Sequence, residues 1–250
     1  MTPSTTPSEA SSGAPQTARR SLPARLLGVI HSPGPTFAAV AADPRWLGVL
    51  VVTLAVSAAS GIALMRTDVG RQALVDQAVR SIEAYGNQVS DAQYAQIERM
   101  SERAVAFTAV GASVGGVVIV ALLSAIVLGV FNVGFDGQAS YRQAFAVVAH
   151  AGVILTLRSL FATPLNYARE SLASPTTLGI FLPMLDEASA PARFLGLIDL
   201  FLIWWIVVLA IGVSVLYRRR PRPVAVAFLC IYAAIAMVMA AAMATFGRAS

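Results

Sequence analysis

Long apolar stretches, separated by short charged or proline-containing ones, dominate the pattern of hydrophobic and polar positions along the chain. The first of them, residues 47–65, has no charged residue. A helix rises about 1.5 Å per residue, so this stretch covers roughly 28 Å, close to the hydrocarbon thickness of a bilayer. The whole pattern predicts five membrane-spanning helices, at about 47–65, 108–132, 143–162, 196–217 and 224–246.

The segments outside these spans differ in character. Residues 1–21 are rich in Ser, Thr and Pro without an apolar period, which is typical of a disordered tail. Residues 22–46 contain two short helical pieces separated by prolines, and we expect an amphipathic segment lying in the membrane interface. Residues 70–103 predict extramembrane helices, one of which begins with a capping box of Ser90 and Gln93.

Composition supports the membrane class. Hydrophobic residues make up 57% of the chain and charged residues only 12%, whereas soluble domains carry about 25% charged residues. The fold class that we expect is therefore all-α, an integral membrane bundle of five transmembrane helices in residues 47–250, preceded by the interfacial segment. The chain contains no lysine and abundant alanine, which indicates a GC-rich bacterial genome.

Arginine positions indicate an orientation. If the N-terminus is cytoplasmic, the inner side holds nine arginines and three acidic residues, and the outer side holds eight arginines and nine acidic residues. The densest basic stretch is the short turn between the last two predicted spans. Because basic residues accumulate on the cytoplasmic side, we expect a cytoplasmic N-terminus in a bacterial inner membrane. This turn could also contact anionic lipid headgroups, through Arg218, Arg219, Arg220 and Arg222.

Two opposite charges fall inside the predicted spans. Arg158 and Asp199 each lie about four residues, roughly 6 Å, from the outer boundary. A charged group inside a membrane costs a few kcal/mol unless it is paired or reaches water. The matched depth favours an ion pair that clamps the third and fourth spans; separate snorkelling to the interface, or a proton relay continuing to His150, are the alternatives.

The sequence gives little reason to expect an enzyme. The Gly-x-Ser-x-Gly pattern at 111–115 lies within an apolar helix, whereas a nucleophile elbow needs a strand-to-helix turn. It is better interpreted as small-residue packing between helices, through which copies of the chain could associate. One cysteine and two histidines are too few for a Cys/His metal site, so we expect no metal and no cofactor. The arginines are dispersed or lie next to spans, so we expect no nucleic-acid partner.

Four segments together suggest a family. They are "SPGPTFAAVAADPRWLGVL" (32–50), the charged stretch ending in "ERM" before a Gly-rich span, "FDGQASYRQAFAVVAHAG" (135–152) and "LIDLFLIWWIVVLAIGVSVLYR" (197–218). In order and spacing the chain resembles the bacterial branch of the Yip family of membrane proteins, named for interaction with Ypt/Rab GTPases. The resemblance implies five spans and a cytoplasmic N-terminus but no known reaction. It also implies that certain residues belong to the family pattern, namely Gly137, Ser140, Arg142, Asp199 and Trp204 or Trp205.

The expected function is therefore that of a non-enzymatic membrane scaffold or membrane-organising module, with the lipid bilayer and other membrane proteins, or further copies of the chain, as partners. A small transporter using Asp199, Arg158 and His150 is the alternative. A water-filled cavity reaching both Asp199 and His150 would favour transport. A dry bundle with Asp199 bonded to Arg158 would favour the scaffold.

Overall fold

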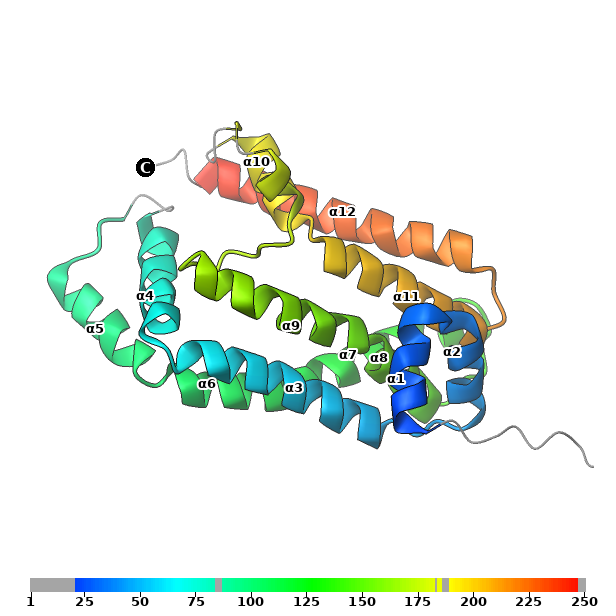
Figure 1. The fold of residues 1–250 in the computed structure, drawn as a ribbon. Helices are drawn as coiled ribbons and strands as arrows, with labels where there is room; N and C mark the ends of the chain where they lie inside the picture. Colours follow the sequence, from blue (N-terminus) through cyan, green and yellow to red (C-terminus); the bar gives the residue numbers. More distant parts are fainter. Residues whose placement is uncertain (1–20, 84–86, 183, 186–188, 247–250) are drawn as a thin grey trace, which may run out of the picture.

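The computed structural model describes residues 21–83, 87–182, 184–185 and 189–246, and the predicted tail lies almost wholly outside this part (Figure 1). Helices make up nearly all of the described regular structure. In chain order they are α1 (Leu22–His31), α2 (Pro33–Ala42), α3 (Leu47–Met65), α4 (Asp68–Glu83), α5 (Asp91–Ser101), α6 (Ala104–Val110), η1 (Gly111–Gly115), α7 (Gly116–Leu128), η2 (Gly129–Val133), α8 (Tyr141–Ala151), α9 (Val153–Ala168), η3 (Leu178–Phe181), α10 (Ala190–Leu197), α11 (Leu200–Leu216) and α12 (Pro221–Phe246).

Four helices in the described part are long and apolar enough to cross a membrane: α3, α6 through η2, α8 through α9, and α12. The multi-pass all-α prediction is confirmed, but the count of five spans is not. The predicted span at 196–217 is divided, because α10 ends at Leu197 and α11 begins at Leu200. Helix α11 has 17 residues, which is about 26 Å and slightly short of the roughly 30 Å hydrocarbon layer.

The long helices lie side by side, and the short ones collect at the two ends of the bundle (Figure 1). Helix α1, helix α2 and the α11–α12 turn lie at one end, which we call the basic end. Helices α4, α5 and α10 lie at the opposite end. In the described part, the basic end carries the residues that the sequence assigned to the cytoplasmic side: Arg25, Arg45, Arg142, Arg218, Arg219, Arg220 and Arg222, with Asp43 and Asp136.

The predicted interfacial segment is a helical hairpin that packs on the bundle. Its two helices meet closely, because a Cβ on Gly28 would lie 2.4 Å from Thr36 Oγ1. Phe37 is fully buried, as are Val29 and Val40. The Gln143 side chain of α8 donates to the Ala41 carbonyl at 3.0 Å. The apolar faces seen in the sequence therefore contact the chain's own helices α8 and α11.

Side-chain caps determine where several helices begin. Ser90 and Gln93 form the capping box predicted for α5. Ser140 and Gln143 form a second capping box at α8, next to the family-pattern residues Gly137 and Arg142. Each cap satisfies backbone N–H groups that a helix start leaves without partners.

The core lies where α2, α8, α9 and α11 meet. A Cβ on Gly212 of α11 would lie 2.7 Å from Val147 Cγ1 and 3.0 Å from the Phe37 ring. Both neighbours are fully buried. In the most apolar window of α8–α9, 56% of the residues are buried, against 17% for α6–η2 and for α12. Helix α8–α9 is thus central, while the other two present most of their surface to the surroundings.

Candidate functional site

Asp199 occupies the break between α10 and α11 and is the N-cap of α11. Its Oδ1 accepts hydrogen bonds from the backbone N–H groups of Phe201 at 2.9 Å and Leu202 at 3.3 Å. An aspartate at this position satisfies orphan donors and places negative charge at the positive end of the helix dipole. The carboxylate therefore ends the apolar helix, a role that differs from the charge within a continuous span that the sequence suggested.

The second carboxylate oxygen of Asp199 accepts from three side chains. The donors to Oδ2 are Arg158 Nε at 2.9 Å, Ser174 Oγ at 2.9 Å and Thr176 Oγ1 at 2.7 Å. The ion pair predicted between Arg158 and Asp199 is present. Arg158 Nη2 also donates to Ser174 Oγ at 3.0 Å, so the guanidinium group and the two hydroxyl groups form one connected network.

The backbone N–H and C=O groups around the break at Asp199 also have hydrogen-bond partners. Tyr232 of α12 accepts from the Asp199 N–H at 3.0 Å and donates to the Leu197 carbonyl at 2.7 Å. The segment before η3 pairs with the break, with Leu200 N–H donating to the Thr176 carbonyl at 3.0 Å. Backbone groups left unpaired within a membrane cost several kcal/mol each, so these bonds permit a non-helical turn here.

We call Arg158, Ser174, Thr176, Asp199 and Tyr232 the Asp199 cluster. It joins α9, the segment before η3, the α10–α11 break and α12. The Asp199 side chain is only 3% exposed, while that of Arg158 is 34% exposed. The carboxylate is thus enclosed, while about a third of the Arg158 side chain is exposed.

Sequence reasoning missed three members of the Asp199 cluster. Ser174 and Thr176 lie in a segment without helical periodicity, so no local pattern indicated that it folds back onto Asp199. Tyr232 lies within an apolar helix and gave no sign of its partner. One signal was available for the break itself, because Asp199 directly precedes an uninterrupted apolar run, which is an N-cap pattern.

His150 lies outside the Asp199 cluster. It is fully buried, its Nδ1 donates to the Ala146 carbonyl at 2.7 Å, and its Nε2 has no hydrogen-bond partner. It precedes Arg158 by eight residues in a nearly continuous helix, which is roughly 12 Å along the axis. The structure therefore does not bring His150 together with Asp199.

The connection between α11 and α12, residues 217–220, is called the basic turn, and several local contacts hold it. Arg218 adopts a left-handed conformation with φ of 52°, and the Arg219 N–H donates to the Ser214 carbonyl at 2.8 Å. The Arg219 guanidinium group donates to the Phe135 carbonyl at 3.1 Å and lies 5.6 Å from the centre of the Phe135 ring. Arg219 thus has partners within the chain, and it is exposed, as are Arg220 and Arg222.

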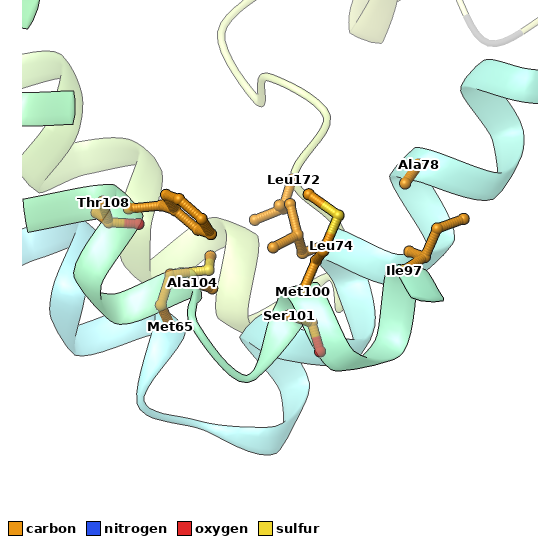
Figure 2. Close-up of a pocket in the computed structure, with 10 residues that line it drawn as sticks. Met65, Leu74, Ala78, Ile97, Met100, Ser101, Ala104, Thr108 and Leu172 are labelled. Atoms are coloured by element: carbon orange, nitrogen blue, oxygen red, sulfur yellow. The ribbon is translucent and has the colours of Figure 1, made fainter. Parts of the chain in front are cut away.

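The opposite end of the bundle holds an apolar pocket of about 500 Å³ (Figure 2). Leu74 and Ala78 of α4 and Ile97 and Met100 of α5 form one side, and Leu172 lies beside them (Figure 2). No charged residue belongs to its described lining. Among the described residues, no group of three or more His, Cys, Asp or Glu side chains lies together as a candidate metal site.

A comparison with protein-family models adds the family. The Yip1 domain model matches residues 27–243, which run from α1 into α12. The chain belongs to the Yip1 domain family. This Yip1 domain contains the Asp199 cluster, the basic turn and the α1–α2 hairpin from residue 27 onward. Searches of curated proteins and of solved structures found no match.

Proposed function

We propose that this Yip1 domain protein is a non-enzymatic scaffold that organises other molecules in the membrane. The observation that carries the proposal is the complete engagement of Asp199. Its two carboxylate oxygens accept five hydrogen bonds, and its side chain is enclosed. A carboxylate used in this way fastens helices to one another, whereas a transport site needs polar groups that a substrate or proton can reach.

The second span, α6 through η2, has small residues on a face that no other part of the described chain covers. This face supports self-association as the way in which the protein organises other molecules. A Cβ on Gly111 or on Gly115 would meet nothing within 4 Å. These two glycines are four residues apart on a helix, a spacing that lets two membrane helices approach closely. Gly116, in contrast, already packs on Leu54 within the chain.

Energy transfer between differently labelled copies in dilute liposomes tests this proposal. We expect the wild-type protein to associate, and Gly115→Leu to weaken association several-fold because the larger side chain keeps the helices apart. Ala234→Leu is the matched control, since Ala234 is exposed on α12, another span. Equal association of Gly115→Leu and wild type would exclude this face, and a monomeric wild type would exclude self-association.

The proposal includes the orientation of the protein in the membrane and the number of its membrane crossings. We infer that α11 crosses the membrane together with the Asp199 cluster, which gives five crossings and a cytoplasmic N-terminus in a bacterial inner membrane. Single cysteines placed in a Cys230→Ser background test this inference with a membrane-impermeant maleimide. Ala190→Cys should react from outside intact cells, and Arg222→Cys only in inverted vesicles. Reaction of both from the same side would show that α11 does not cross.

A further inference from the structure

A groove at the basic end combines an apolar floor with two arginines. It measures about 560 Å³ and lies between the η2 region and α12. Phe131 and Phe135 line one side, Ala227 and Ile231 of α12 line the other, and Arg219 and Arg220 lie at the turn. No acidic residue belongs to the described lining. The groove therefore offers hydrocarbon contact along its length and positive charge at one end.

The depth of the groove fits one leaflet of a bilayer. Its α12 wall runs from Pro223 to Ile231, a separation of eight residue steps, or about 12 Å along the helix. Half of a 30 Å hydrocarbon layer is roughly 15 Å. Helix α12 is one of the candidate spans, and the turn precedes its first residue. The arginines thus lie at headgroup level, and the apolar wall lies at the level of acyl chains.

The two arginines differ in their contacts within the chain. Arg219 lies over Phe135, with a hydrogen bond to its carbonyl group and a contact with its ring. Arg220 also lines the groove and is exposed. A guanidinium group presents several N–H donors in a geometry that matches phosphate oxygens. The arrangement favours a phosphate group between the turn and the groove entrance.

We propose that this groove is a binding site for one anionic phospholipid, with the phosphate on Arg220 beside Arg219 and an acyl chain against Ala227 and Ile231. The pocket of Figure 2 lacks a charged lining residue and provides no matching headgroup contact. Binding at this groove is independent of the scaffold function. The ligand is a membrane lipid because a soluble phosphate compound would make no use of the apolar wall.

Native mass spectrometry of the full-length protein, titrated with phosphatidylglycerol and with phosphatidylcholine of the same acyl chains, tests the site. We expect tighter binding of phosphatidylglycerol. Arg220→Gln should weaken it by about fivefold, the effect of one basic residue near an anionic surface, and should leave phosphatidylcholine unchanged. Arg222→Gln is the matched control, because Arg222 is exposed two residues further on, at the start of α12, but does not line the groove.

A second pair of variants tests the apolar wall. Ala227→Trp fills the groove and should weaken binding of both lipids, while Val226→Trp, at an exposed position outside the lining, should not. Equal losses for Arg220→Gln and Arg222→Gln would show a diffuse attraction to charge and overturn the site. Unchanged binding by Ala227→Trp, or equally tight binding of glycerol phosphate without acyl chains, would overturn the groove. Thermal unfolding of each variant verifies that it is folded.

Discussion

Replacing Asp199 separates its role as a helix cap from its role as a charge. Asp199→Ala removes the acceptor of two backbone N–H groups and three side-chain donors. Loss of an N-cap costs about 1 kcal/mol. Breaking a buried ion pair from one side costs about 3–5 kcal/mol, but the Arg158 side chain is 34% exposed and can turn toward headgroups or water, so about 2 kcal/mol is expected here. The total is roughly 3 kcal/mol.

The partner substitution should cost less. Arg158→Ala leaves Asp199 with both backbone donors and with the hydroxyl groups of Ser174 and Thr176. We therefore expect a loss of about 1 kcal/mol, close to what single polar contacts contribute in membrane proteins. Asp199→Asn should fall between the two alanine variants, because asparagine is a good N-cap without a charge.

The double swap Asp199→Arg with Arg158→Asp gives the sharpest comparison. If the two residues act only as opposite charges, the swap should restore stability. Since an arginine offers no acceptor to the backbone N–H groups of α11 or to the two hydroxyl donors, we expect the swap to remain as unstable as Asp199→Ala. Unfolding by sodium dodecyl sulfate in mixed micelles measures each free energy. Full recovery in the swap, or equal losses for the two alanine variants, would refute the cap as the main role.

Three further variants test other parts of the fold in the same unfolding assay. Gly212→Val should cost about 2 kcal/mol because its side chain enters the space of Val147, whereas Gly129→Val, whose Cβ meets open space, should be close to neutral. Tyr232→Phe should cost about 1–2 kcal/mol, since it removes one acceptor and one donor at the break beside Asp199. Ser140→Ala should cost about 1 kcal/mol through loss of the α8 capping box. Wild-type stability of Gly212→Val, Tyr232→Phe or Ser140→Ala would contradict the contact assigned to that residue, and an equal loss in Gly129→Val would contradict the one assigned to Gly212.

Some contacts could be predicted from the sequence, because the number of residues along a helix gives the depth of a side chain in the membrane. Arg158 and Asp199 could be paired from the sequence because each lies a countable number of residues from the end of an apolar stretch. The capping box of Ser90 and Gln93 could be predicted because its geometry is local. Four of the five predicted spans correspond to helices of sufficient length and hydropathy for the same reason.

Contacts that depend on the path of an irregular segment could not be predicted. Thr176 reaches Asp199 only because the segment before η3 folds back and pairs with the α10–α11 break. No periodicity specifies that path. The packing of α1 and α2 was also hidden, since a small apolar face suits either a lipid surface or a neighbouring helix. Phe37 shows the second outcome, because its ring lies against the position of Gly212.

The break at Asp199 bears on the crossing that we propose for α11. A helix of 17 residues covers about 26 Å, so that crossing would leave a few ångströms of the hydrocarbon layer for non-helical backbone. Such backbone is tolerated at that depth only when it is buried in protein and hydrogen-bonded. The Asp199 cluster meets this requirement, since Tyr232, Thr176 and the carboxylate itself bond the backbone groups on both sides of the break. Arg158 neutralises the charge that the cap introduces, and its side chain is partly exposed. The carboxylate in this apolar stretch is thus best explained as the start of a helix, which accounts for both its burial and its five donors.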